Sequence, residues 1–96
     1  MKNVAIYYKL QKNEDIEHSI QKINQLIEKL NPKHRILGVF IEANKENKKF
    51  MELINSPLSD LNFLYMNSLP DDEFDYKLLK ELARAEQFEI RGFANM

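Results

Sequence analysis

The most informative absence in this chain is cysteine, of which its 96 residues contain none. Without thiols the protein forms no disulfide, has no cysteine nucleophile and holds no zinc through cysteine. This composition fits a reducing compartment, so we expect a cytoplasmic location.

Glycine is nearly as scarce, because Gly38 and Gly92 are the only two in the chain. A glycine-rich loop that cradles phosphate groups therefore cannot form, which argues against a nucleotide site. The two histidines, His18 and His34, are well separated and have no second ligand at metal-binding spacing. The sequence thus predicts no metal site and no cofactor.

Long hydrophobic runs are missing as well. The first apolar stretch is short and is broken by Lys9, so we expect neither a signal peptide nor a membrane span. The formal net charge of −1 gives no overall attraction to nucleic acid or to an anionic membrane. An apolar content of 44% in 96 residues predicts one soluble globular domain covering residues 1–96.

What is present is a regular alternation of apolar strands and amphipathic helices. The apolar runs predict strands within 4–11, whose last few residues leave the sheet, at 36–41, at 61–66 and, nearer an edge, at 88–93. Helices are predicted between them, around 16–30, 50–54 and 74–83. This order predicts an α/β fold with three layers, in which about four mostly parallel strands have helices on both faces.

The helix predictions carry detail that a structure can test. The first helix is expected to be capped within Asn13–Asp15 and to end at Asn31–Pro32. Its predicted buried stripe consists of Ile16, Ile20, Ile23, Ile27 and Leu30. Residues 44–49 are expected to form a polar, basic hinge. The predicted apolar face of the last helix consists of Phe74, Leu78, Leu79, Leu82 and Ala83.

The first strand is the element around which the rest is arranged. Its last residues leave the sheet at the carboxyl edge, where open α/β folds bind their ligands. Lys9 and Gln11 are therefore expected where an active site would lie. The tyrosines Tyr7, Tyr8 and Tyr65 are interpreted as core residues, although one tyrosine beside Lys9 would also suit a protein-binding patch.

Several segments resemble, in the correct order, the catalytic domain of the serine recombinases (the resolvase/invertase family). Val4–Leu10 is similar to the family's opening strand, and Ile36–Glu42 to its second strand, which ends in an acidic residue. Leu61–Met66 is similar to the third strand. The helical segments that carry the likeness are His18–Lys22 and Lys48–Ile54. The resemblance covers nearly the whole chain and implies a resolvase-like fold.

The residues that carry the family's chemistry are nevertheless replaced here. Gln11 stands at the position of the nucleophilic serine, and an amide cannot attack a phosphodiester. Lys9 stands at an arginine position and lacks the bidentate fork that suits phosphate. Ile23 is the match for a glutamine near the active site. The segment 67–72 contains no arginine and adds two aspartates that would repel DNA.

The expected mobile loop is shortened to Ala43–Asn47, and the chain stops at Met96, before the family's dimerisation helix and DNA-binding region. The resemblance therefore implies an inactive relative, a pseudoenzyme rather than a working recombinase. We expect a small regulator from a phage, another mobile element or a bacterium that binds a protein of unknown identity. The residues expected to make this contact are Tyr8, Lys9, Gln11, Lys45, Lys48 and Lys49.

Three alternatives stay open at this point. The basic segment 33–49 would suit a nucleic-acid-binding accessory protein. Glu42 and Asp71 would suit a metal-dependent hydrolase if they converge at the carboxyl edge. A homodimer would cover apolar surface that the family's long helix otherwise covers.

Overall fold

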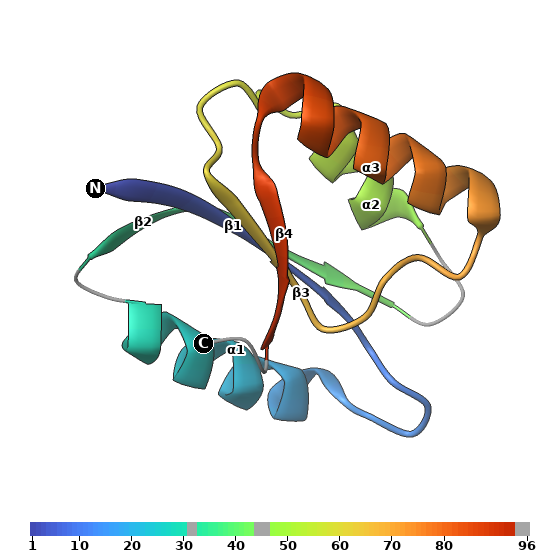
Figure 1. Cartoon of the computed structure of the whole chain (residues 1–96). Helices are drawn as coiled ribbons and strands as arrows, with labels where there is room; N and C mark the ends of the chain where they lie inside the picture. The colour runs from blue at the N-terminus through green and yellow to red at the C-terminus, as the bar shows by residue number, and fades with distance from the viewer. Residues whose placement is uncertain (31–32, 44–46, 94–96) are drawn as a thin grey trace.

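The computed structural model describes residues 1–30, 33–43 and 47–93. Its elements follow in the order β1 (Lys2–Lys9), α1 (Ile16–Leu30), β2 (His34–Glu42), α2 (Lys48–Ile54), β3 (Phe63–Met66), α3 (Glu73–Glu86) and β4 (Glu89–Gly92). Helix α1 covers one face of the sheet, and α2 and α3 cover the other (Figure 1). The predicted three-layer α/β fold is confirmed. Within the described ranges, no helix is long and apolar enough to cross a membrane.

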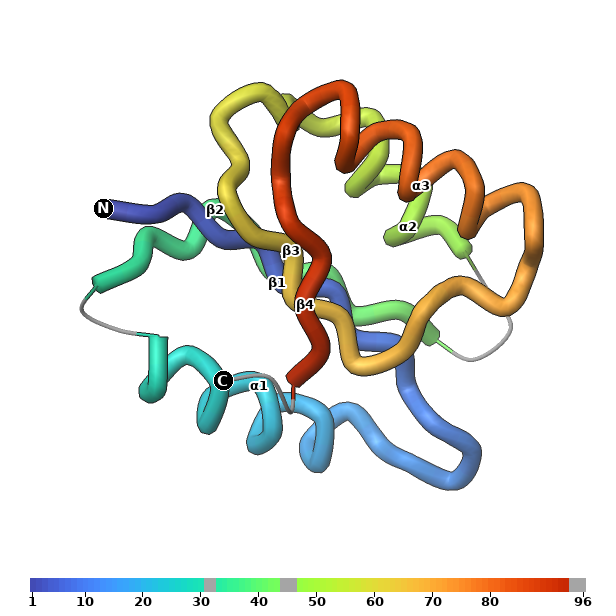
Figure 2. The backbone as a smooth tube through the Cα atoms, in the orientation of Figure 1, coloured from blue at the N-terminus to red at the C-terminus, as the bar shows by residue number. Residues whose placement is uncertain are grey.

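The four strands are arranged in the order β2-β1-β3-β4, and every pairing is parallel. Strand β1 is central and β4 lies at an edge, as the alternating pattern of 88–93 predicted. The chain leaving β1 runs to α1 on one face, whereas the chain leaving β3 runs to α3 on the other (Figure 2). The carboxyl ends of β1 and β3 therefore form the topological switch point, where open α/β sheets bind ligands.

The central strand divides its side chains between two hydrophobic cores. Ala5 and Tyr7 pack beneath α2 and α3, in a core with Phe50, Leu64 and Leu79. On the opposite face, Val4, Ile6 and Tyr8 pack with α1 through Ile23, Leu26 and Leu30. Successive strand side chains point to opposite faces, so an unbroken apolar run is what a strand covered on both faces requires.

The predicted buried stripe of α1 is partly wrong. Its buried residues are Ser19, Ile23, Leu26 and Leu30, while Ile16 and Ile20 are 56% and 42% exposed. Spacings of three and four residues fit both stripes, and only packing against the sheet selects the face that is buried. Similarly, Phe74 does not belong to the apolar face of α3, because it is 72% exposed.

The predicted boundaries also need correction. Strand β1 ends at Lys9, so Leu10 and Gln11 leave the sheet as expected, whereas α2 already begins at Lys48, so Lys48 and Lys49 are helical rather than part of a hinge. The hinge residues 44–46 and the predicted helix end at 31–32 lie outside the described residues.

Candidate binding site at the carboxyl edge of the sheet

A cleft of about 320 Å³ opens at the carboxyl edge, on the face covered by α2 and α3. We call it the edge cleft. Its lining comes from the end of β1, the start of α2, the loop after β3 and the start of α3. These residues are Tyr7, Lys9, Asn47, Phe50, Ser68, Leu69, Pro70, Asp71, Asp72 and Asp75.

Among the described residues, the charged ones that line the edge cleft are one lysine and three aspartates. Lys9 contributes the cation, and Asp71, Asp72 and Asp75 contribute the acids. The structure explains part of this acidity, because the Asp72 side chain accepts a hydrogen bond from the Asp75 amide at 3.1 Å and caps α3. Acids in the first helical turn are also favoured by the helix dipole.

Glu42 lies behind this cleft as a structural group. It ends β2, is 1% exposed, and accepts hydrogen bonds from the amides of Lys49 (3.2 Å) and Phe50 (2.9 Å). It thereby caps α2, since Asn47 at the N-cap position makes no side-chain hydrogen bond there. The Tyr7 hydroxyl donates a third hydrogen bond at 3.0 Å. Burial, together with the Glu42 carboxylate, raises the pKa of Tyr7 well above its ordinary value.

The switch point itself is bridged by the side chain of Asn67. Its Oδ1 accepts a hydrogen bond from the Lys9 amide, and its Nδ2 donates one to the Lys9 carbonyl oxygen, both over 2.8 Å. A side-chain amide here replaces the backbone partner that a longer β3 would supply. The backbone groups at the end of β1 are consequently satisfied by the fold itself.

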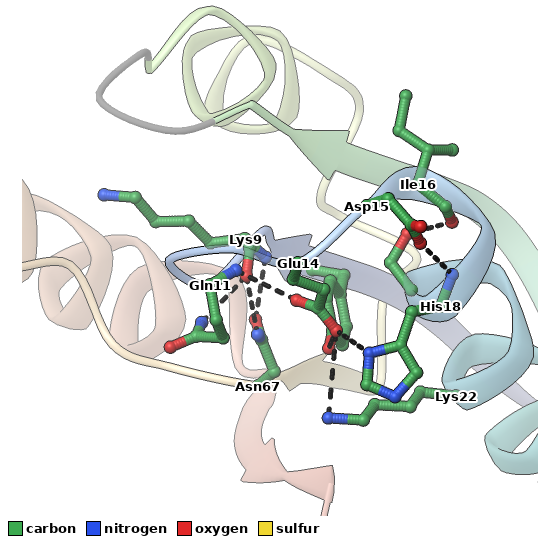
Figure 3. A network of polar contacts seen from close by, with 10 residues as sticks. Lys9, Gln11, Glu14, Asp15, Ile16, His18, Lys22 and Asn67 are labelled. Atoms are coloured by element: carbon green, nitrogen blue, oxygen red, sulfur yellow. Dashed lines mark hydrogen bonds and ion pairs between the residues drawn. The ribbon is translucent and has the colours of Figure 1, made fainter.

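Glu14 is the centre of a polar network on the α1 side of the sheet (Figure 3). It accepts hydrogen bonds from the Tyr8 hydroxyl (2.5 Å) and the Gln11 amide (2.9 Å). His18 lies 3.0 Å and Lys22 3.8 Å from the same carboxylate. Burial by itself raises the pKa of Glu14, but these hydrogen bonds and charges outweigh it and hold the pKa below its ordinary value.

The predicted contact residues do not form one surface. Lys9 lines the edge cleft, and Lys48 and Lys49 are exposed at the start of α2. Tyr8 is 1% exposed, which corrects its assignment to a contact surface and supports the alternative of a core residue. Lys45 lies outside the described residues.

Gln11 also lies outside the edge cleft that Lys9 lines. Its side chain folds back to donate a hydrogen bond to the Lys9 carbonyl oxygen (2.9 Å), whereas the Lys9 side chain extends away from the Glu14 network (Figure 3). Gln11 lines a different hollow, together with Tyr8, Lys22 and Phe93. The nucleophile position of the recombinase resemblance is therefore not part of the edge cleft.

The basic segment 33–49 is divided by the strand that it contains. Lys33 and Arg35 lie at the amino end of β2, and Lys48 and Lys49 follow its carboxyl end. From His34 to Glu42 there are eight residue steps, or about 26 Å along the strand. Lys49 is also engaged by Glu52 at 3.1 Å. These cations do not gather into one patch for a nucleic acid.

The structure does not favour a metal site formed by Glu42 and Asp71, because Glu42 is buried and already accepts three hydrogen bonds. Asp71, its suggested partner, is exposed at the rim of the edge cleft. Across the described part of the chain, no three His, Cys, Asp or Glu side chains are grouped so as to hold a metal ion.

Sequence reasoning missed Asn67 and Glu14 as organisers of the polar contacts at this edge. Asn67 directly follows the third predicted strand, which is the one signal that could have pointed to it. Glu14 was interpreted only as an acid at a helix start, because its contacts with Tyr8 and Lys22 depend on how the loop folds.

Neither a scan of protein-family models nor a search of curated proteins finds a match to this chain. The similarity to serine recombinases therefore stays a hypothesis that rests on the residues quoted above.

Proposed function

We propose that this chain is a catalytically inactive, resolvase-like domain that acts as a small protein-binding regulator in the cytoplasm, encoded by a phage or another mobile element. The observation that carries the proposal is that some polar side chains at the carboxyl edge are bonded within the fold, whereas others stay accessible. Three polar side chains at this edge that could take part in chemistry, Glu42, Glu14 and Asn67, are instead engaged in hydrogen bonds of the fold.

What remains accessible at this edge suits a protein contact. Lys9 and three aspartates line the edge cleft, and Leu69 on its rim is 48% exposed. Phe74, which precedes Asp75 in the first turn of α3, is 72% exposed. Exposed apolar side chains among charged residues are a common composition for a recognition surface. Lys9 and Leu69 are therefore the residues from which we expect the main contribution.

The proposal is tested by capture from nuclease-treated bacterial lysate, with the tagged chain as bait and mass spectrometry as readout. We expect one stoichiometric protein that Leu69→Ser releases. Leu37→Ser is the matched control, because Leu37 on β2 is 47% exposed, close to the 48% of Leu69, and does not line the edge cleft. Capture that disappears with nuclease, or that both variants reduce equally, would contradict the proposal.

Self-association is a separate part of the proposal. Ile16 and Ile20 on α1 and Val39 on β2 are large apolar side chains that are at least 42% exposed. Light scattering over a range of concentrations measures whether a second copy covers them. A constant monomer mass up to millimolar concentration would exclude the homodimer.

A further inference from the structure

A second hollow shares Ser68 and Leu69 with the edge cleft. It has a volume of about 500 Å³ and is lined by the ends of β3 and β4, the loop after β3 and one side of α3. We call it the apolar groove. Its apolar lining comes from Met66, Leu69, Tyr76 and Ile90, and its polar lining includes Ser68 and Lys80.

The volume of the apolar groove and its position at the carboxyl edge of the sheet both suit a small ligand. Small-molecule sites usually measure about 300–1,000 Å³ and combine an apolar lining with a few polar groups. The groove adjoins the carboxyl ends of two parallel strands, which is the edge where open α/β folds bind ligands. The recombinase resemblance makes no use of the groove, and of the two residues expected to contribute most to protein binding only Leu69 lines it.

The charge of the groove differs from that of the edge cleft. No Asp or Glu occurs among the described residues that line it, whereas three aspartates line the edge cleft. Lys80 is exposed, and its ammonium lies 5.3 Å from the centre of the Tyr76 ring. A cation held beside an aromatic ring and an apolar lining complements a ligand with an apolar body and a negative end.

Arg91 does not add a second cation to this site. Although the residue contributes to the lining, its guanidinium carbon lies 3.9 Å from the centre of the Phe63 ring, which packs against the core beneath α1. The guanidinium is bonded to Glu89 and, at 3.4 Å, to the Tyr65 hydroxyl. The charge that a ligand meets is therefore that of Lys80.

We propose that the apolar groove binds a small organic acid, with its apolar body on Met66, Leu69 and Ile90 and its carboxylate at the Lys80 ammonium. This inference does not depend on the proposed protein-binding function. An acid bound in the groove would contact the same loop that lines the edge cleft, since Ser68 and Leu69 line both hollows.

The test is an NMR titration of the full-length, ¹⁵N-labelled chain with 3-phenylpropanoate, beside its neutral analogue 3-phenylpropan-1-ol. We expect the acid to shift the amide signals of Leu69, Tyr76, Lys80 and Ile90, with a dissociation constant of about 1 mM. Shifts confined to Lys9 and the aspartates of the edge cleft would overturn the proposal, as would the absence of any shift.

Two lysine variants separate the charge from the apolar contact. Lys80→Met keeps the apolar stem and should weaken the acid about threefold to fivefold while leaving the alcohol unchanged. Lys77→Met is the matched control, because Lys77 is also exposed on α3 but does not line the groove. Equal weakening by both variants, or equal affinity of the wild type for acid and alcohol, would overturn the assignment of the carboxylate to Lys80.

Discussion

The side chain of Asn67 holds both backbone groups of Lys9, accepting from its amide and donating to its carbonyl oxygen over 2.8 Å each. This pair joins the ends of β1 and β3, two neighbouring strands whose following helices lie on opposite faces of the sheet (Figure 1). The residue that lines the edge cleft is thus positioned by a side chain from the neighbouring strand end.

Replacing Asn67 with aspartate tests this relationship. An aspartate still accepts from the Lys9 amide but, when ionised, cannot donate to the carbonyl oxygen, so the oxygen faces a negative charge. We expect a loss of about 1–3 kcal/mol in the free energy of unfolding, measured with urea. Asn24→Asp on the exposed surface of α1 is the control and should cost less than about 0.5 kcal/mol.

Glu42 provides a second test, because its carboxylate caps α2 and bonds to Tyr7. Glu42→Ala leaves two buried or half-buried donors and the Tyr7 hydroxyl without a partner, so we expect a destabilisation of about 2–4 kcal/mol. The control is Glu52→Ala, which removes only an exposed ion pair with Lys49 and should cost about 0–1 kcal/mol. Similar midpoints of thermal unfolding for both variants would show that Glu42 has no such role.

The Glu14 network predicts a pH dependence of stability. The pKa of Glu14 is lower in the folded protein than its ordinary value of about 4.3, so folding favours the charged form. Its contribution is therefore fully present above the ordinary pKa and is lost as the pH falls through the lower folded value. Glu14→Gln should be less stable than the wild type at pH 7, and the two should converge below about pH 4. A difference that is constant with pH would contradict this.

The orientation of α1 predicts unequal effects of two isoleucines on the same helix. Ile23 is 4% exposed and Ile20 is 42% exposed. Ile23→Ala should destabilise the protein by about 2–4 kcal/mol, whereas Ile20→Ala should cost less than about 1 kcal/mol, as measured by chemical denaturation. Equal losses would mean that the helix buries the wider stripe expected from the sequence.

Much of the fold could be predicted from the order of residues alone. The unbroken apolar run at Val4–Tyr8 indicates a strand covered on both faces, and the alternation of strands with amphipathic helices leaves few arrangements other than a parallel sheet. Polar residues after each strand also place Lys9 at the carboxyl edge, since parallel strands end together.

Tertiary structure alone decided which polar side chains are engaged. Tyr8, expected as a core or contact residue, became a buried donor to Glu14, and Gln11 turned away from the edge cleft that Lys9 lines. The choice between Ile20 and Ser19 on α1 was settled by packing as well.

The physical reason for this division is the range of the interactions involved. Hydrophobic periodicity depends on residues that are close together in the chain, so the sequence by itself determined the strands, the helices and their alternation. The bonds that shape the carboxyl edge join residues far apart in the chain, Asn67 to Lys9 and Tyr7 to Glu42. Their partners become neighbours only when the strands pair, so the tertiary structure alone decided the form of the candidate site.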